Sequence, residues 1–303
     1  MLDIRPLHPL FGAEIRGIAV SGQVDDAVFA EIRGAFERYS LLVLRGQDIT
    51  DDQQLAFSRR FGPLETTKVG TVGEGTELVF LTNIGPDGAI VPETHRQWLN
   101  TRANQLWHSD SSFKRVPALA SLLSGREVPH RGGETQFVGM RAVWRELPEA
   151  QKRRVEGRVA VHDYAYSRGK IDPHLATEPE RRALPPVRQT MVRVHPLTGE
   201  KGLYIGSHAC GIEGMAQEDG RALIAELLDF ATQPRFVHTH RWQRHDLLIW
   251  DNRFVIHRGR PFPSNRRRYL VRTTVAGDAP TAPQYAADEG RETRAEDPAR
   301  VER

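Results

Sequence analysis

The sequence has little of what marks several classes of protein. Among its 303 residues there is one cysteine, Cys210, which excludes an internal disulfide framework and a cysteine-rich zinc or iron–sulfur site. No apolar run reaches the roughly 18 residues of a membrane-spanning helix. Residues 1–6 carry charge where a signal peptide would be apolar. We therefore expect a cytoplasmic protein in a reducing environment.

An excess of charge of one sign is also missing. The 42 basic and 39 acidic residues leave a net charge of +3, which is too balanced for a protein that binds nucleic acid through its overall charge. Lysine is scarce, since only five of the basic residues are lysine. Neither nucleic acid nor a membrane is an expected partner, and homo-oligomer formation stays open.

The last part of the chain differs from the rest. Residues 278–303 are polar, lack aliphatic periodicity, and hold seven acidic residues and four arginines, so this segment contributes −3 and the body 1–277 carries +6. This composition predicts a mostly disordered C-terminal tail. No repeat or linker divides the body, so we expect residues 1–277 to form one domain.

The body predicts a mainly β fold with flanking helices. Apolar residues recur at helical spacing in three segments, 24–39, 51–61 and 221–231, the second beginning after Thr50 as a capping residue. Short apolar runs predict strands at 41–44, 78–81, 118–123, 190–194, 236–239, 247–250 and 269–275. Short strands separated by Gly, Pro and Asn turns favour a two-sheet antiparallel barrel wrapped by helices.

Two residues in the segment 103–113 carry ligand chemistry. His108 and Asp110 are two positions apart, so on an extended strand both side chains would point to the same face. An imidazole and a carboxylate are two of the three ligands of a 2-His-1-carboxylate facial triad, which suits non-haem Fe(II). The third ligand should be a histidine from a distant strand.

A second segment offers a candidate for that histidine. His257 ends an apolar stretch and is followed by Arg268 and Arg272, eleven and fifteen residues later. Period-2 alternation places both arginines on one face of a strand, with Leu270 between them. An arginine that points into a β core needs an anionic partner, and a carboxylate bound in bidentate fashion meets that need.

The sequence resembles the Fe(II)/2-oxoglutarate-dependent dioxygenases of the taurine/2,4-dichlorophenoxyacetate dioxygenase family. The segments 8–12, 45–47, 61–64, 103–113 and 250–260 carry the resemblance, together with a histidine followed by arginines at +11 and +15. It is closest to the 2,4-dichlorophenoxyacetate (2,4-D) dioxygenase branch. The resemblance implies a double-stranded β-helix (jelly-roll) core. It also implies O2-dependent hydroxylation coupled to decarboxylation of 2-oxoglutarate to succinate and CO2.

Site residues are carried over where this sequence matches the family pattern. The resemblance implies that His108, Asp110 and His257 are the iron ligands, and that Thr135 and Arg268 bind the distal carboxylate of 2-oxoglutarate. It also implies that Arg272 binds a carboxylate of the cosubstrate or the anionic group of the substrate, and that Asn104 lines the substrate pocket. No catalytic group beyond the metal ligands is expected.

Substrate recognition is less closely defined. A pocket for an aryloxyacetate needs cations for the carboxylate and apolar walls for the ring. The candidates for binding the carboxylate, or for supporting the residues that bind it, are Lys68, His195, His208 and Arg272. Segment 66–100 is expected to form a lid. Alternatives are an alkylsulfonate such as taurine, although a taurine-type histidine and tyrosine pair near 66–75 is missing, and another small organic acid. A metal-free jelly-roll ligand-binding protein is the alternative from a different class.

Overall fold

Strand β13 (Leu247–Asp251) shows how the apolar runs of the sequence build the core. In the computed structural model, which describes residues 1–68 and 70–285, Leu248 and Trp250 pack into one hydrophobic cluster and Leu247 and Ile249 into another. Both faces of the strand are therefore buried. This is why the run is continuously apolar where a strand with one solvated face would alternate.

Strands provide most of the framework. In chain order they are β1 (Asp3–Pro6), β2 (Ala13–Arg16), β3 (Leu41–Leu44), β4 (Val79–Thr82), β5 (Ala120–Glu127), β6 (Thr135–Gly139), β7 (Val159–His162), β8 (Val187–Thr190), β9 (Val192–Val194), β10 (Lys201–Leu203), β11 (Ala209–Ile212), β12 (Val237–His240), β13, β14 (Val255–Gly259) and β15 (Tyr269–Val275). A seven-stranded sheet has the order β1-β2-β3-β13-β5-β15-β4, and a three-stranded sheet the order β12-β6-β14. Smaller sheets are formed by β11-β7-β8 and by β10-β9.

Helices lie between and around these strands. They are α1 (Asp26–Tyr39), α2 (Asp51–Arg59), α3 (Arg96–Ala103), α4 (Met140–Glu146), α5 (Glu149–Val155), α6 (Tyr164–Gly169), α7 (Glu178–Ala183) and α8 (Gln217–Ala231), with a short 3-10 helix at Pro234–Phe236. Among the described residues, no helix is long and apolar enough to cross a membrane.

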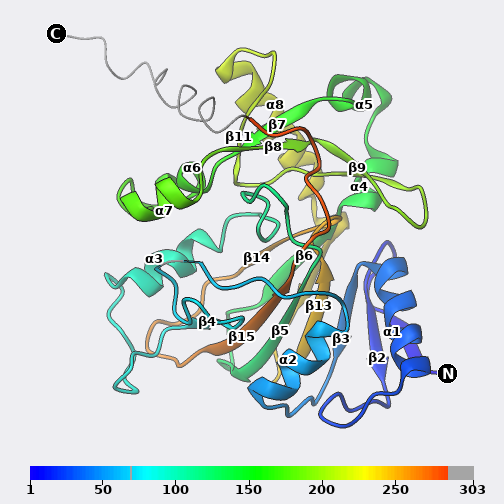
Figure 1. Cartoon of the computed structure of the whole chain (residues 1–303), viewed down its shortest axis with the longest axis vertical. Helices are drawn as coiled ribbons and strands as arrows, with labels where there is room; N and C mark the ends of the chain where they lie inside the picture. Colours follow the sequence, from blue (N-terminus) through cyan, green and yellow to red (C-terminus); the bar gives the residue numbers. More distant parts are fainter. Residues whose placement is uncertain (69, 286–303) are drawn as a thin grey trace.

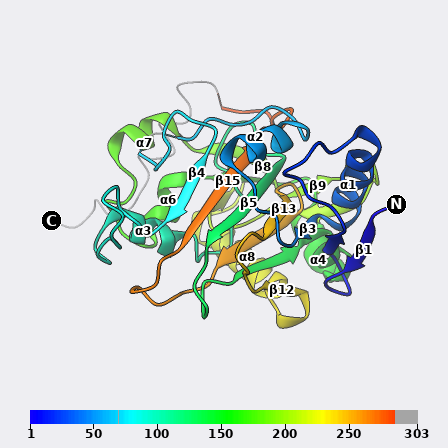
Figure 2. The same cartoon turned by 90° about the horizontal axis from the view of Figure 1, so that it is seen from below.

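The two principal sheets share one buried interior. Phe137 on β6 and Val255 on β14 pack with Trp250 on β13 and Leu270 on β15 in a single cluster, so the three-stranded sheet faces the large one. Figure 2 shows β4, β15, β5, β13 and β3 of the large sheet side by side. The predicted two-sheet fold is confirmed.

Helices cover the outer faces of both sheets. Phe36 of α1 and Phe57 of α2 join the cluster that contains Leu247 and Ile249, and Figure 1 places both helices beside the large sheet. On the other side, residues of α4 and α8 form a cluster with β6 and the small sheets. The predicted wrapping by helices is therefore confirmed.

Element boundaries differ in places from the sequence prediction. Helix α1 begins at Asp26 because the carboxylate of Asp25 accepts a hydrogen bond from the backbone N–H of Val28 as its N-cap. Thr50 caps α2 as predicted, with Gln53 completing a capping box. Helix α8 begins four residues before the predicted start. The predicted strand 190–194 is interrupted, since β8 ends and β9 begins on either side of one residue.

The polar C-terminal segment begins with residues that pack on the body. Thr281 donates to the side-chain oxygen of Gln189 at 2.5 Å, and the Tyr285 hydroxyl donates to Glu213 at 3.0 Å. Residues 281–285 are thus held against β8, while most of the expected tail lies further along the chain. The polar composition of this segment could not indicate which of its residues form hydrogen bonds with the body. The rest of the expected tail, 286–303, lies outside the described residues.

Candidate metal and substrate site

His108, Asp110 and His257 meet in one buried cluster. Their candidate ligand atoms all lie within 4.8 Å of one another. Nε2 of His108 is 3.9 Å from one carboxylate oxygen of Asp110, and Nε2 of His257 is 3.8 Å from the other. Two imidazole nitrogens and a carboxylate gathered in this way match the donor set that non-haem Fe(II) takes. The group that sequence spacing predicted is thus brought together.

Backbone hydrogen bonds hold the two histidines beside each other. His257 lies on β14 and forms an isolated bridge with His108, in which each backbone N–H donates to the other residue's carbonyl, at 3.0 and 2.8 Å. Asp110 starts a turn in which Ser111 has a φ of +54°. The expectation that His108 and Asp110 lie on one extended strand is therefore wrong. The turn folds the carboxylate back toward the bridge.

Surrounding side chains orient the Asp110 carboxylate. The Ser121 hydroxyl on β5 donates to Oδ2 at 2.7 Å, and Arg272 on β15 donates to Oδ1 at 2.5 Å. The side-chain amide of Asn252 donates to the Ser121 oxygen at 2.9 Å, and the indole N–H of Trp250 donates to the Asn252 oxygen, also at 2.9 Å. Such surrounding hydrogen bonds fix ligand geometry around protein metal sites.

Burial sets the protonation states that a metal requires. Burial lowers the pKa of His257 to about 3 and also lowers the pKa of His108. For Asp110, burial alone would raise the pKa, but Arg272 and the two histidines outweigh it and hold the pKa well below its usual value. Nδ1–H of His108 can donate to the Leu106 carbonyl at 2.7 Å, which leaves Nε2 free to ligate. Neutral imidazoles and an ionised carboxylate are the metal-binding forms.

Arg268 contacts Gly133, which lies two residues before Thr135 in the chain. Thr135, on β6, pairs with Gly259 on β14, and its hydroxyl oxygen accepts a hydrogen bond from the indole N–H of Trp242 at 3.0 Å. Arg268 lies just before β15, and its guanidinium donates to the Gly133 carbonyl at 3.4 Å. The carboxylates of the described residues do not pair with Arg268, and its buried Nε has no acceptor. Burial lowers the pKa of Arg268 to about 10.

A cavity of about 790 Å³ opens in front of the cluster. Of the residues proposed from sequence, those that line it are Lys68, Asn104, His108, Asp110, His208 and Arg272. Its apolar wall includes Phe80, Leu81 and Tyr269. Segment 66–100, the expected lid, contributes much of this lining through the stretch before β4 and through α3.

Lys68 faces the cavity as part of an ion-pair group. Its ammonium lies 2.6 Å from Oε1 of Glu180, a buried carboxylate on α7. Arg96 on α3 lies 2.5 Å from the other oxygen of Glu180. Burial alone would raise the pKa of Glu180, but hydrogen bonds from Lys68 and Thr177 outweigh it and lower the pKa to about 2. One carboxylate thus anchors two cations from the lid segment.

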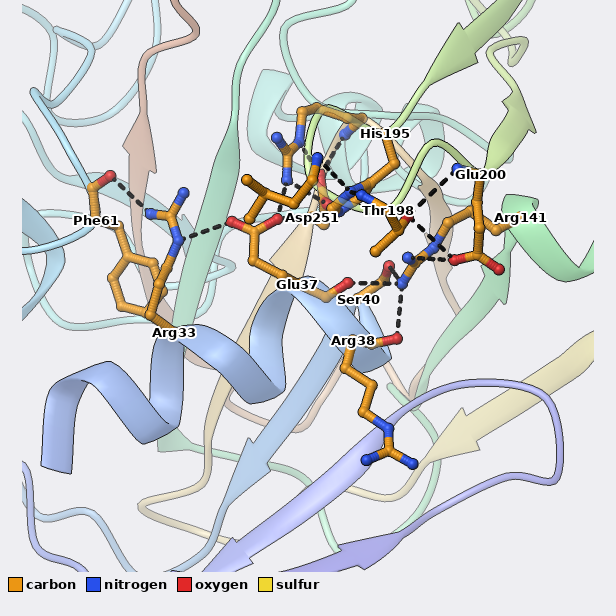
Figure 3. A network of polar contacts seen from close by, with 12 residues as sticks. Arg33, Glu37, Arg38, Ser40, Phe61, Arg141, His195, Thr198, Glu200 and Asp251 are labelled. Carbon is orange, nitrogen blue, oxygen red and sulfur yellow. Dashed lines mark hydrogen bonds and ion pairs between the residues drawn. The ribbon is translucent and has the colours of Figure 1, made fainter. Parts of the chain in front are cut away.

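His195 lies elsewhere, which corrects its assignment to the substrate site. Its ring is fully buried, Nε2 is 3.0 Å from Glu37, and Nδ1 accepts backbone N–H groups of Leu197 and Thr198. Figure 3 shows this network, in which Glu37 of α1 lies between Arg33 and His195. The sequence could not show that the turn after His195 folds the ring inward.

Glu37, His195 and Asp251 form a second group with metal-ligand spacing. Arg253 already bridges its acids: the guanidinium is 2.7 Å from Glu37 and 2.9 Å from Asp251. The arginine supplies the positive charge that a metal would bring, so we interpret this group as structural.

Sequence reasoning missed several residues around the cluster. Ser121 is a single polar residue within an apolar strand, and Trp242 is a single aromatic residue within a polar turn, so nothing local marks their distant partners. Arg168 on α6 lines the cavity but has no motif around it. For Asn252 there was a signal, because it lies in the segment 250–260 that carries the family pattern.

Comparison with known proteins decides the family. The family model described as "Taurine catabolism dioxygenase TauD, TfdA family" matches residues 3–274, nearly all of the described chain. The chain belongs to the TauD/TfdA dioxygenase family. The cluster of His108, Asp110 and His257 falls within the matched region, as do Thr135, Arg268 and Arg272.

Individual TauD/TfdA proteins are similar over almost their whole length. The chain is 42% identical over 279 residues to an alpha-ketoglutarate-dependent 2,4-dichlorophenoxyacetate dioxygenase of Cupriavidus pinatubonensis, covering 90% of this chain and 97% of that protein. It is 40% identical over 276 residues to the protein of the same name from Burkholderia sp. (strain RASC), covering 89% and 93%.

A solved structure agrees in fold. The crystal structure of AAD-2 in complex with Mn(II) and N-oxalylglycine superposes with a TM-score of 0.87 at 39% identity, covering 94% of this chain and all of that one. This likeness confirms the jelly-roll core expected from the sequence.

Proposed function

We propose that this chain hydroxylates a carboxylate-bearing substrate, and that an aryloxyacetate such as 2,4-dichlorophenoxyacetate is that substrate. The protein is a 2-oxoglutarate-dependent dioxygenase by family membership and by its similarity to the two 2,4-D dioxygenases. The observation that carries the proposal is the buried cluster of His108, Asp110 and His257 at the end of a large cavity. The expected products are a phenol and glyoxylate, with succinate and CO2.

The donor set fits Fe(II). His108 and His257 are neutral, Asp110 is ionised, and both Nε2 atoms are directed toward the carboxylate. We assign the three protein ligands of Fe(II) to these residues, a donor set that would hold the metal and leave it accessible to the cosubstrate. When bound, iron and 2-oxoglutarate supply the oxidising chemistry of the reaction. Ser121 and Arg272 hold the carboxylate in one orientation throughout.

The region around Gly133 fits the distal carboxylate of 2-oxoglutarate. The buried Nε of Arg268 has no acceptor among the described residues, and a carboxylate would supply one. The Thr135 hydroxyl accepts its hydrogen bond from Trp242, so its own proton is free to be donated to the same carboxylate. We therefore assign cosubstrate binding to Arg268 and Thr135. Arg272 is hydrogen-bonded to Asp110, so we place it beside the metal ligands and not at the distal carboxylate.

The cavity fits an aromatic acid. Phe80, Leu81 and Tyr269 supply apolar surface for a ring, and Asn104 and His208 supply polar groups near His108. These walls orient the carbon beside the ether oxygen toward the ligand cluster and keep water from it. Hydroxylation at that carbon gives a hemiacetal, which breaks down to the phenol and glyoxylate. The anionic group of an alkylsulfonate or of another small organic acid could bind to the same lysine and arginine side chains of the cavity.

The setting of the enzyme is proposed in the same way. The relatives' substrates support a small-molecule partner, and the balanced charge supports the absence of a nucleic-acid or membrane partner. We propose a cytoplasmic location, which the single, unpaired Cys210 supports. We also propose that residues 1–277 act as one domain, because the large sheet joins strands from both ends of that range.

Cosubstrate binding can be tested without turnover. Fe(II) and 2-oxoglutarate added to the metal-free protein in the absence of O2 should produce a metal-to-ligand charge-transfer absorption band. The band should be absent from Asp110→Ala, and Arg268→Ala should require much more 2-oxoglutarate to reach it. A wild-type protein that binds Fe(II) but gives no band would contradict the proposal.

A further inference from the structure

Six lysine and arginine side chains line the cavity, and they are not equally free to bind an anion. Five are paired with carboxylates of the protein. The pairs are Lys68 and Arg96 with Glu180, Lys114 with Glu65, Arg267 with Glu127 and Arg272 with Asp110. The sixth is Arg168. Among the described residues, no carboxylate or other hydrogen-bond acceptor contacts its guanidinium.

Arg168 is held in place by an aromatic ring, not by an ion pair. Its guanidinium lies over the ring of Tyr164, one helical turn earlier in α6, at 4.7 Å from the centroid. Tyr164 is itself buried, and its hydroxyl donates to Glu180 at 3.2 Å. Nε of Arg168 is shut off from solvent without an acceptor. A buried donor without an acceptor is unfavourable, so the binding of an acceptor at this position is favoured.

The same ring links Arg168 to the candidate metal cluster. His208 stacks on Tyr164 with a centroid distance of 6.5 Å, and its ring meets that of His108 edge-on at 6.3 Å. The rings of Tyr164 and His208 therefore connect Arg168 to His108, and among the described residues that line the cavity Arg168 is the lysine or arginine without a carboxylate partner.

We propose that Arg168 binds the carboxylate of the organic-acid substrate. This inference rests on the proposed function and adds to it the group that recognises the substrate's anionic end. A guanidinium can bind a carboxylate through two parallel N–H groups, and a planar ring stacked beneath the guanidinium fixes the direction of these donors. The apolar wall of Phe80, Leu81 and Tyr269 is then available to the remainder of the substrate. Lys68, by contrast, is already paired with Glu180, a carboxylate that it shares with Arg96.

A carboxylate also occurs on 2-oxoglutarate, so the experiment separates the two sources. Arg168→Gln and Arg168→Lys are compared with the wild type in succinate-release assays, using the carboxylate that the wild type turns over fastest and its primary carboxamide. KM is measured separately for the acid and for 2-oxoglutarate. Thermal unfolding of each variant reports folding. Arg267→Gln is the matched control, because that arginine also lines the cavity but is paired with Glu127.

Loss of one charge-assisted contact should lower kcat/KM for the acid about 10- to 100-fold in Arg168→Gln. The carboxamide should be affected about twofold or less, so that the preference for acid over amide falls by the same factor. The KM for 2-oxoglutarate should stay within about twofold. Arg168→Lys should recover part of the loss, because a lysine keeps the positive charge but lacks the two parallel N–H donors of the guanidinium. Arg267→Gln should behave as the wild type.

Two results would overturn the inference while leaving the proposed function intact. One is an Arg168→Gln variant, folded as the wild type, that keeps its preference for the acid over the carboxamide. The other is a variant in which only the KM for 2-oxoglutarate rises, which would assign Arg168 to the cosubstrate. A wild-type protein that releases no succinate with any carboxylate would instead contradict the proposed function, and the inference with it.

Discussion

The guanidinium of Arg272 donates to Oδ1 of Asp110 at 2.5 Å, so a residue of β15 neutralises the carboxylate that lies between the two histidines. Both side chains are largely buried. Removal of one partner of such a pair leaves an uncompensated charge. We expect Arg272→Gln to lower the free energy of unfolding of the metal-free protein by roughly 3 kcal/mol, measured by urea denaturation with a chelator present.

Adding a divalent metal should shrink that loss. Mn(II) bound at Asp110 would supply the positive charge in place of Arg272, so the difference between wild type and Arg272→Gln should be smaller with the metal than with the chelator. Arg267→Gln is the control, because its pair with Glu127 is exposed and worth about 0 to 1 kcal/mol. An equal loss for both variants would contradict the interpretation.

Ser121 should tune metal affinity without being a ligand. Its hydroxyl donates to Oδ2 of Asp110 and accepts from Asn252, so it fixes the carboxylate that we assign to the metal. We expect Ser121→Ala to weaken Mn(II) binding about 10- to 100-fold, as for other groups that orient metal ligands. Isothermal titration calorimetry measures this directly.

The same strand provides the control. Ser124 is also fully buried on β5, but its hydroxyl has no hydrogen-bond partner among the described residues. Ser124→Ala removes the same atom and should leave Mn(II) affinity unchanged. If Ser121→Ala binds Mn(II) as tightly as Ser124→Ala, the hydrogen bond to Asp110 has no role in metal binding.

Trp242 should assist 2-oxoglutarate binding through Thr135. The indole N–H donates to the Thr135 oxygen, which leaves the hydroxyl proton for the cosubstrate. Without the indole N–H the hydroxyl is free to rotate, so we expect Trp242→Phe to raise the dissociation constant for 2-oxoglutarate. The rise should be about 3- to 10-fold, equivalent to one neutral hydrogen bond.

A double-mutant cycle isolates that contact. The charge-transfer band formed with Fe(II) and 2-oxoglutarate without O2 gives the affinity of each variant. In a Thr135→Val background, Trp242→Phe should have no further effect, because the acceptor is already gone. Additive losses in the double variant would show that Trp242 acts independently of Thr135.

Acid should destabilise the fold through Glu37. Burial alone would raise the pKa of Glu37, but the hydrogen bond from His195 and the charges of Arg253 and Arg33 outweigh it and lower the pKa from 4.5 to about 2. A carboxyl group with a lowered folded-state pKa stabilises the protein above its unfolded pKa. That contribution is lost as the pH falls from about 4.5 toward 2.

Denaturation in urea at several pH values between 6 and 3 tests this. The free energy of unfolding should fall less steeply with decreasing pH in Glu37→Gln than in the wild type, because the titrating group is gone. Glu178→Gln, at an exposed pair with Arg182 on α7, should keep the wild-type slope. If the free energy of unfolding falls with decreasing pH at the same slope in all three proteins, Glu37 is not the group responsible for the loss of stability in acid.

Long apolar runs made the framework predictable from sequence. Residues 41–44 and 247–250 are buried on both faces of the large sheet, and their continuous hydrophobicity marked them as strands. The short helices α3 to α7 were not predicted. They have six to eight residues each, too few for a helical period to stand out from loop sequence.

The candidate metal cluster was predictable for a different reason. His108, Asp110 and His257 belong to patterns of several residues, so their meeting followed from the family resemblance even though His108 and Asp110 do not share a strand. His195 and Arg168 had no such pattern. His195 is directed toward Glu37 on α1, and Arg168 on α6 reaches a cavity whose other walls come from distant segments of the chain. Both placements depend on tertiary packing, which no local pattern reveals.

The most direct test of the central claim is a balance of products. Purified protein with Fe(II), O2, 2-oxoglutarate and 2,4-dichlorophenoxyacetate should release succinate, glyoxylate and 2,4-dichlorophenol in equal amounts. Asp110→Ala should release none of them. Succinate formed with no phenol, even with the wild type, would contradict the proposed substrate. If no succinate forms with any carboxylate or sulfonate tested, the proposed dioxygenase function itself is contradicted.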